Sequence, residues 1–267
     1  MLGDITLGQF YPTNSIIHKL DPRVKIMIAL LIIVGLFVAD SFYAYLLCTL
    51  FIAIAVFLSK VPVGFIFKGL KPLLFIMVFT AVINVFLTDG RTLFKVWFLR
   101  ATYEGVIIAF VMVLRLFLLV TATTLLTLTT SPIMLTDGIE RLLKPFNAIK
   151  VPSHEIAMMM TIALRFIPTL LEETDKIIKA QSARGADFTT GSILKRAKAM
   201  IPILIPLFIS SFKRADELAT AMECRCYKGG DGRTKLKVLK CEKRDYIALF
   251  SIVILLILII FLNIFAG

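Results

Sequence analysis

Long apolar runs separated by short polar segments dominate both ends of this chain. Five of them are long enough to cross a bilayer, at about Val24–Ala39, Phe42–Leu58, Pro72–Thr88, Glu104–Thr127 and Tyr246–Phe265. A membrane-spanning helix needs roughly 20 apolar residues, and about 17 are tolerated. The pattern therefore predicts an all-α polytopic membrane protein with about five transmembrane helices.

Residues 131–245 have a different pattern, in which charged residues interrupt apolar ones at helical spacing. They predict three amphipathic helices, at about Ile133–Phe146, Ser153–Arg184 and Ile193–Cys226. We expect Ser153 to cap the second helix, because a serine hydroxyl accepts a hydrogen bond from a free N–H of the first turn. We expect Gly185 to end that helix, because glycine tolerates the left-handed conformation of a C-cap.

The two patterns divide the chain into three parts. Residues 1–130 form a membrane domain with four spans, 131–245 a cytoplasmic or interfacial domain of amphipathic helices, and 246–267 the final transmembrane helix. The first twenty residues lack an apolar core of the length that a cleavable signal needs. We therefore expect a multi-pass protein of the cell membrane without a cleaved signal.

The charge sets the expected orientation. The net charge is +12, and residues 131–245 carry 20 of the 30 lysines and arginines, so the cations gather in one polar region. In a soluble protein this charge would suggest nucleic acid, but 58% of the residues of the whole chain are hydrophobic, which indicates a membrane protein and no nucleic-acid partner. The excess of cations predicts that the N-terminus and residues 131–245 are cytoplasmic and the C-terminus is outside.

Prolines and a short apolar run interrupt the amphipathic pattern of residues 131–245. Pro168 is expected to kink the second helix, because its ring removes a backbone bond and crowds the preceding turn. Residues 199–212 are apolar but only about 14 long, and they contain Pro202 and Pro206, which favours a helix at the membrane interface. If residues 199–212 instead spanned the bilayer, all residues after them would lie on the opposite side of the membrane from the one predicted here.

Two tripeptides centred on arginine end the second and third amphipathic helices. They are Ala183-Arg184-Gly185 and Cys224-Arg225-Cys226. An arginine at a helix C-terminus is favoured by the helix dipole, and its planar fork can bind a carboxylate or backbone carbonyls. The small flanking residues would let each tip enter a groove. A single arginine in a last turn needs no function, but two equivalent ones indicate two similar soluble partners.

Two features of the apolar segments have both a functional and a structural interpretation. Arg115 lies inside the fourth span, where a charge is a functional candidate, although a structural pair is favoured here. Met158, Met159 and Met160 could form an adaptable docking surface, but core packing or lipid contact explains them equally well.

The chain offers little for catalysis or metal binding. Cys224, Cys226, Cys241 and His154 could in principle hold a metal, but no paired C-x-x-C motif supports it, so no metal is expected. The segment Gly229–Lys235 lacks the spacing of a phosphate-binding loop and is interpreted as a turn. No catalytic motif involves His18 or His154, and we expect no enzyme.

These residues together resemble one family. The chain is similar to EcfT, the transmembrane coupling component of energy-coupling factor (ECF) vitamin transporters. The resemblance covers nearly the whole chain, beginning with Leu20-Asp21-Pro22-Arg23 and Lys25. It is strongest from Gln181–Asp187 through Pro202, Pro206 and Ala215–Ala219 to Ala221–Tyr227. One departure is Cys-Arg-Cys in the second motif, where the family often has Ala-Arg-Gly.

The resemblance implies a mechanism. Ala183, Arg184 and Gly185, and likewise Cys224, Arg225 and Cys226, would end crossed coupling helices that dock on two ATP-binding-cassette subunits, EcfA and EcfA-prime. The membrane helices would hold a separate substrate-binding protein, the S-component, with Met158, Met159 and Met160 as a candidate contact. The chain itself would hold no cofactor, because ATP and Mg²⁺ would be bound by the partner ATPases.

Two other function classes remain open from the residues alone. A self-sufficient permease or channel would need polar groups that converge within its own spans, and the sequence offers Arg115, Asn84 and several threonines. An intramembrane enzyme is disfavoured by the lack of motifs. The identity of a transported solute cannot be read from these residues.

Overall fold

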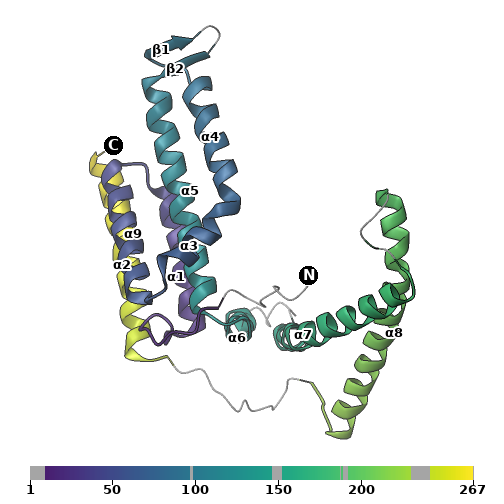
Figure 1. The fold of residues 1–267 in the computed structure, drawn as a ribbon. Helices are drawn as coiled ribbons and strands as arrows, with labels where there is room; N and C mark the ends of the chain where they lie inside the picture. The colour runs from purple at the N-terminus through teal and green to yellow at the C-terminus, as the bar shows by residue number, and fades with distance from the viewer. Residues whose placement is uncertain are drawn as a thin grey trace. The chain divides into compact units, whose positions relative to one another are not determined.

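A computed structural model of the chain describes residues 10–96, 99–145, 152–186, 188, 192–229 and 241–266. It is almost entirely helical, with one small β-hairpin (Figure 1). The elements are α1 (Pro22–Val38), α2 (Phe42–Ser59), α3 (Val63–Leu70), the 3-10 turn η1 (Lys71–Leu73), α4 (Leu74–Leu87), β1 (Thr92–Val96), β2 (Leu99–Thr102), α5 (Tyr103–Thr129), α6 (Pro132–Leu143), α7 (Ser153–Ala183), α8 (Ile193–Cys224) and α9 (Lys243–Ala266).

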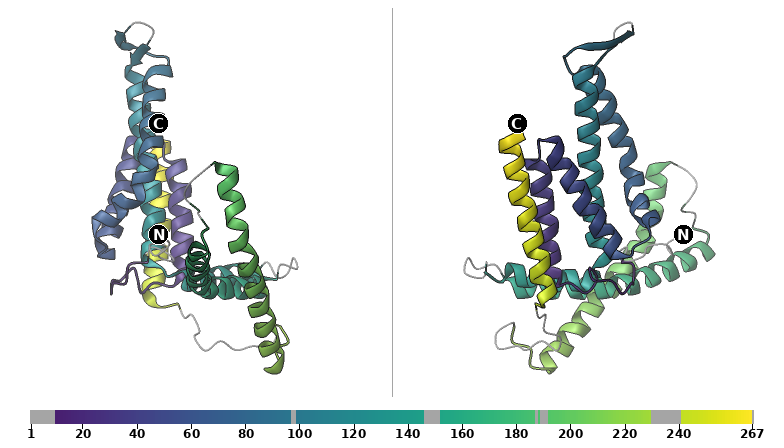
Figure 2. Two further views of the ribbon diagram at one scale, coloured as in Figure 1. Left: turned by 45° about the vertical axis from the view of Figure 1, so that its right-hand side comes forward. Right: turned by 90° about the vertical axis from the view of Figure 1, so that its left-hand side faces the viewer.

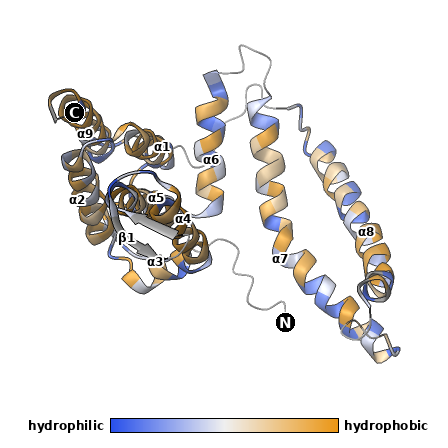
Figure 3. Ribbon diagram, turned by 90° about the horizontal axis from the view of Figure 1, so that it is seen from above, coloured by the Kyte–Doolittle hydropathy of each residue, from blue (hydrophilic) through white to orange (hydrophobic). Residues whose placement is uncertain are grey.

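The described residues form two compact units. Residues 10–138 and 241–266 form a membrane unit, and 139–229 form an amphipathic unit, so the boundary falls within α6. Figure 3 shows the difference in composition, since α1, α2 and α9 are apolar almost all round, whereas α7 and α8 alternate apolar and polar positions. A helix that is apolar all round is typical of a membrane span.

The core of the membrane unit lies between α1, α2, α5 and α9. Helices α1 and α9 pack closely although they stand at opposite ends of the sequence, as Figure 2 shows. Gly35 makes this approach close, because a Cβ there would lie 2.9 Å from a methyl carbon of Leu256. Leu36, Ile252 and Ile259 are fully buried in this core. The last transmembrane helix therefore completes the bundle that the first ones begin.

Helices α4 and α5 pack against each other and are joined by the hairpin of β1 and β2 (Figure 2). The strands are antiparallel, with Thr92 opposite Thr102 and Val96 opposite Leu99. The hairpin lies between the predicted spans Pro72–Thr88 and Glu104–Thr127, and the sequence did not predict its strands. Its threonine, valine and aromatic residues are those that favour strands.

The predicted membrane helices are confirmed as helices, with one addition. Among the described residues, five helical segments are long and apolar enough to cross a membrane, by length and composition: Phe42–Ser59, Val63–Leu87, Tyr103–Thr129, Ser153–Ala183 and Lys243–Phe265. The fourth of these is α7, which the sequence assigned to the amphipathic domain. Helix α1, predicted as a span, has 17 residues and lies at the lower limit of length.

Arg115 has internal partners in the apolar bundle. Its guanidinium donates hydrogen bonds from Nε to Tyr45 Oη at 2.9 Å and from Nη2 to the Ala39 carbonyl at 3.3 Å. The charge also lies over the rings of Phe37 and Tyr45, at 5.8 and 5.7 Å from their centroids. The arginine thus ties α5 to the turn between α1 and α2. The structural role favoured from the sequence is consistent with these contacts.

A network of polar groups joins three distant segments of the membrane unit. Lys25 is 5% exposed, and its ammonium donates to the carbonyls of His18 and Thr129, at 3.2 and 2.9 Å, and to Thr130 Oγ1 at 3.4 Å. A lysine has three donors, and all three are used. One side chain therefore links the start of α1 to the segment before it and to the end of α5.

Two buried carboxylates extend this network to α9. Asp245 accepts from the backbone N–H of Asp21 at 2.8 Å and from that of Glu242 at 2.7 Å. Asp21 in turn caps α1 by accepting from Arg23 N and pairs with the Arg23 guanidinium at 3.0 Å. The motif Leu20-Asp21-Pro22-Arg23 with Lys25 is therefore the place where the first and last membrane helices are fastened together.

His18 lies beside this network. Burial lowers its pKa below the usual 6.5, the hydrogen bond with the Tyr11 carbonyl partly opposes this effect, and the charge of Lys25 adds a smaller lowering of the pKa. Its Nε2 lies 2.9 Å from that carbonyl and its Nδ1 lies 2.7 Å from Ser15 Oγ. A neutral ring with the proton on Nε2 satisfies both contacts.

We predict that Lys25→Met destabilises the membrane unit. The substitution keeps an apolar stem but leaves two carbonyls and a hydroxyl without their donor, which costs about 1–3 kcal/mol. Thermal unfolding of the purified protein in detergent measures the loss. Lys19→Met is the matched control, because Lys19 is an exposed cation of the preceding segment. Equal midpoints for the two variants would show that the network contributes nothing.

Candidate docking site at the ends of α7 and α8

Helices α7 and α8 are long continuous rods of 31 and 32 residues. Pro168 lies inside α7, and Figure 3 shows that α7 bends along its length. Pro202 and Pro206 lie inside α8, so residues 199–212 are the middle of one longer amphipathic helix. Among the described residues, α8 is not one of the helices apolar enough to span a membrane.

The start of α7 differs from the prediction. Ser153 is the first helical residue, and Pro152 occupies the N-cap without a side-chain hydrogen bond. The predicted cap by Ser153 is therefore wrong by one position. The Pro152 carbonyl accepts the first helical bond, from Ile156 N at 3.0 Å. Ser153 already lies inside the helix, so its hydroxyl does not act as the N-cap acceptor.

The end of α7 confirms the predicted role of Gly185. This residue has φ +88°, in the left-handed region. The N–H of Gly185 donates to Ser182 O at 3.0 Å, and the N–H of Ala186 donates back to Gln181 O at 3.0 Å. These two bonds define the Schellman motif. Arg184 is thereby fixed at the C-cap, with its side chain leaving the last turn of the helix.

The end of α8 has the same geometry with a different residue at the turning point. Cys226 adopts φ +57°. Its N–H donates to Glu223 O at 2.8 Å, and the N–H of Tyr227 donates back to Met222 O at 3.1 Å. Arg225 therefore occupies the same position in its cap as Arg184 does on α7. The helix itself ends at Cys224, two residues before the end that the sequence predicted at Cys226.

A cysteine in the left-handed region is uncommon. The Cβ atom makes this conformation unfavourable for L-residues by roughly 1–2 kcal/mol. Gly185 is free of that cost, and a Cβ at Gly185 would have nothing within 4 Å. The requirement at both positions is thus a backbone conformation that turns the chain away from the helix axis.

All six predicted docking residues are exposed: Ala183, Arg184, Gly185, Cys224, Arg225 and Cys226. Within the part of the chain that the structure describes, neither Arg184 nor Arg225 has an ion-pair or hydrogen-bond partner for its guanidinium. An exposed guanidinium at a fixed backbone position retains five donors for an external acceptor.

An ion pair joins the two helices. Arg214 Nη2 of α8 lies 2.7 Å from Glu173 Oε2 of α7, and α7 and α8 pack against each other. Arg184 follows Glu173 by 11 residues, and Arg225 follows Arg214 by 11 residues. At 1.5 Å per residue, each tip lies about 16 Å along its own helix from the pair. The contact thus joins equivalent positions of two arms of equal length.

The predicted methionine surface lies in the other half of α7, away from the tips. Met159 is exposed, at 59%, and Met158 and Met160 are partly buried. A larger apolar surface lies on α8, within the apolar run 199–212 that the sequence predicted as a helix at the membrane interface. Its exposed residues recur every three to four positions along one face: Met200, Ile201, Leu204, Ile205, Phe208, Ile209 and Phe212. This spacing is the one expected for one face of a helix.

The candidate metal ligands do not come together as a cluster. Among the described residues, no group of three or more His, Cys, Asp and Glu side chains could hold a metal ion. His154 Nδ1 instead lies 3.1 Å from Glu140 Oε1. Cys224, Cys226 and Cys241 are exposed free thiols. Most of the predicted turn at Gly229–Lys235, from residue 230 on, lies outside the described residues.

Comparisons with known proteins agree on one family. Residues 13–236 match the CbiQ family, described as cobalt transport protein. A protein of Clostridium kluyveri named energy-coupling factor transporter transmembrane protein EcfT is 57% identical over the full length of both chains. Proteins of the same name from Ruminiclostridium cellulolyticum and Bacillus subtilis are 58% and 46% identical, over 92% and 98% of this chain and 92% and 100% of theirs.

The family match covers most of the chain, and these relatives align over nearly their whole length. The multi-pass helical architecture fits the transmembrane proteins that their names describe. This chain belongs to the EcfT family of energy-coupling factor transporter transmembrane proteins.

Proposed function

We propose that this chain couples ATP hydrolysis by two soluble ATPase subunits, EcfA and EcfA-prime, to the uptake of a vitamin or other micronutrient. The observation that carries the proposal is the pair of C-caps with the same hydrogen bonds, each with an exposed arginine at the end of a long helix whose guanidinium has no partner among the described residues. Two equal cationic tips fit two similar acceptor sites. The ATPases would bind ATP and Mg²⁺, and a separate S-component would bind the solute.

The caps explain how a small contact could be specific. A guanidinium forms two parallel charge-assisted hydrogen bonds with one carboxylate or with paired carbonyls. Its backbone is fixed by the Schellman bonds, so less conformational entropy is lost on docking than for a mobile loop. The exposed residues beside each arginine are small, which leaves room for the walls of a groove.

The helices explain how motion at a tip could reach the membrane. A helix of 31 residues is about 46 Å long. The Glu173–Arg214 pair joins α7 and α8 at equivalent positions, so a displacement of either tip acts on the same contact. When the ATPases move relative to each other, the angle between the arms would change, and the far ends of the helices would move with it.

The proposed orientation of the chain in the membrane follows from the side on which the ATPases act. They consume cytoplasmic ATP, so both tips belong in the cytoplasm, and this agrees with the excess of lysine and arginine in residues 131–245. We propose that the N-terminus is also cytoplasmic and that the C-terminus is outside. The three-part division into residues 1–130, 131–245 and 246–267 follows the same assignment.

The S-component would meet apolar surface of this chain. Met158, Met159 and Met160 are one candidate contact, and the exposed face of α8 from Met200 to Phe212 is a larger one. Methionine and phenylalanine side chains suit a surface that accepts more than one partner. The solute would be bound by the S-component, and the description of the CbiQ family is compatible with a metal ion in place of a vitamin.

A permease that binds its own solute has less support. It needs polar groups directed at a solute within the membrane unit, and the guanidinium of Arg115 is already bonded to Tyr45 and Ala39. Purified protein in liposomes separates the two functions. Uptake by the chain alone, without ATP or partners, would favour the permease over the coupling component.

We predict that Arg184→Glu or Arg225→Glu leaves membrane insertion unchanged but weakens ATPase docking. Loss of one partner of a desolvated charge pair costs about 2–5 kcal/mol, so retention of an ATPase subunit on the affinity-purified chain should fall at least about tenfold. Co-purification and ATP-dependent vitamin uptake in vesicles measure both effects. Lys179→Glu and Lys213→Glu are the controls, since each reverses an exposed charge away from a tip. Normal docking and uptake in both arginine variants would rule out the tips as the contact.

We predict that Glu173→Arg and Arg214→Glu each lower the uptake achieved per ATP hydrolysed, and that the double exchange restores part of it. Each single change places like charges 11 residues before the tips, whereas the double change rebuilds the pair with its members reversed. Coupling energies for residues in contact are about 0.5–3 kcal/mol. Lys213→Glu controls for net charge on α8. If the double variant is as poor as the worse single one, the pair has no role in coupling.

A further inference from the structure

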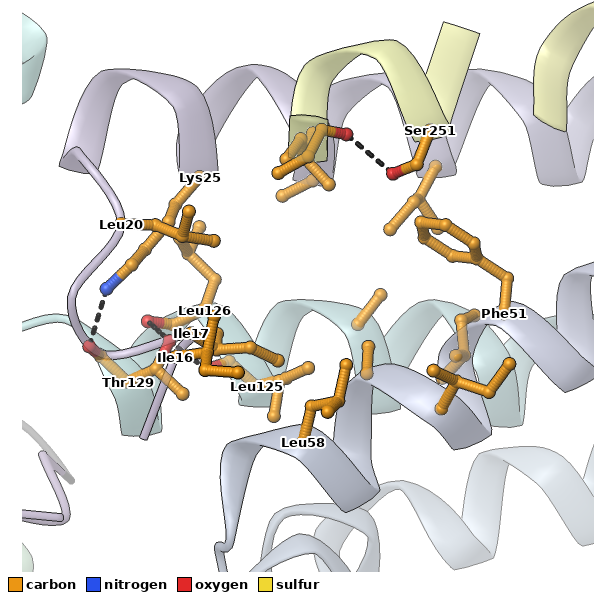
Figure 4. Close-up of a pocket in the computed structure, with 18 of the residues that line it drawn as sticks. Ile16, Ile17, Leu20, Lys25, Phe51, Leu58, Leu125, Leu126, Thr129 and Ser251 are labelled. Carbon is orange, nitrogen blue, oxygen red and sulfur yellow. Dashed lines mark hydrogen bonds between the residues drawn. The ribbon is translucent and has the colours of Figure 1, made fainter. Parts of the chain in front are cut away.

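The membrane unit contains an apolar cavity of about 530 Å³ (Figure 4). It lies between α1, α2, α5 and α9, beside the segment that precedes α1. Its floor includes the buried residues Leu20, Ala29, Ile52 and Leu125. This volume falls within the roughly 300–1,000 Å³ of pockets that hold small molecules.

The polar residues in the wall are already satisfied by the chain itself. Figure 4 shows the Lys25 ammonium turned to the Thr129 carbonyl. Its other two donors bind the His18 carbonyl and the Thr130 hydroxyl. Thr129 Oγ1 donates to Leu125 O at 2.8 Å, and Ser251 Oγ donates to Ala248 O at 2.7 Å. Water needs two to four polar partners in a cavity. The interior therefore suits an apolar occupant and disfavours water or a polar solute.

The mouth of the cavity is apolar as well. Ile54, Leu58 and Ile247 line the cavity and are exposed, at 50, 42 and 68%. They belong to membrane-spanning helices, so the medium outside this opening is the hydrocarbon of the bilayer. A lipid chain is the apolar molecule that has direct access to such an opening.

Lys25 is buried, but a second cation of the lining is exposed. Arg244 is a lining residue in the first turn of α9, and its side chain is 46% exposed. It pairs with Glu242, using Nε at 3.1 Å and Nη2 at 2.6 Å on one carboxylate oxygen. A guanidinium has five donors, so its other edge is left for an anion. The amino end of α9 adds a partial positive charge at the same place.

We propose that this cavity holds an acyl chain of an anionic phospholipid, whose phosphate lies against Arg244. The apolar interior takes the chain, the exposed isoleucines and leucine let it enter from the bilayer, and Arg244 stands where a membrane helix begins and headgroups lie. The occupant fills the gap that the α1, α2, α5 and α9 bundle leaves open. This proposal is independent of the docking function of α7 and α8.

Photolabelling tests the site. The full chain, purified with its co-expressed partners, is placed in nanodiscs of equal parts phosphatidylglycerol and phosphatidylcholine. One of the two lipids carries a diazirine on its acyl chain, and labelled peptides are mapped by mass spectrometry. We expect label on the cavity walls of α2 and α9. Phosphatidylglycerol should label about fivefold more than phosphatidylcholine, the preference that about 1 kcal/mol from one basic side chain gives.

Two variants with matched controls separate the chain from the headgroup. Ala55→Phe fills the cavity and should remove the label, whereas Ala53→Phe on the exposed side of the same helix should not. Arg244→Gln should reduce the phosphatidylglycerol signal to the phosphatidylcholine level, and Lys243→Gln, which does not line the cavity, should leave it unchanged. Arg244 is exposed, so this second variant is expected to fold even if Ala55→Phe does not.

Three outcomes would overturn the proposal. Equal labelling by both lipids would remove the role of the phosphate and Arg244. Labelling that survives Ala55→Phe would place the lipid elsewhere on the protein surface. The absence of lipid label from the cavity walls of α2 and α9 would show that no acyl chain occupies the cavity.

Discussion

A cation in an apolar environment must find its partners within the chain, because no water is available to solvate it. Lys25 follows this constraint with three donated bonds, and Arg115 follows it with a phenol, a carbonyl and two rings. Both side chains thereby fasten helices that are distant in sequence. Arg184 and Arg225 are the contrast, since their guanidinium groups are exposed and unpaired within the described residues. The difference separates cations that hold the fold from cations directed at a partner.

Most helices could be predicted because they depend on local pattern. The apolar runs gave the membrane helices, and glycine after Arg184 gave the end of α7. The errors also have local causes. Pro152 moved the N-cap by one residue, and the strands within Thr92–Thr102 were not predicted. The left-handed conformation of Cys226 was not predicted either, because a residue with a Cβ seldom adopts a positive φ.

The contacts that matter most to coupling could not be predicted from pattern. Glu173 and Arg214 are 41 residues apart, and nothing in their neighbourhoods indicates that they meet. Asp245 and Asp21 are separated by almost the whole chain, and their hydrogen bond depends on how α9 returns to α1. The apolar cavity is likewise a result of imperfect packing between four helices. Each of these is a tertiary feature, set by how helices meet.

The two tips combine the same backbone with different surroundings. Both arginines occupy a C-cap closed by the same pair of hydrogen bonds, so either could enter the same kind of groove. The neighbours differ, since exposed Ser182 on α7 corresponds to exposed Glu223 on α8, and Ala186 corresponds to Tyr227. An acidic residue two positions before the arginine changes which walls a groove can have, because like charges across an interface are repelled. If two different ATPases are to be told apart, these flanking positions, and not the arginines, must carry the difference.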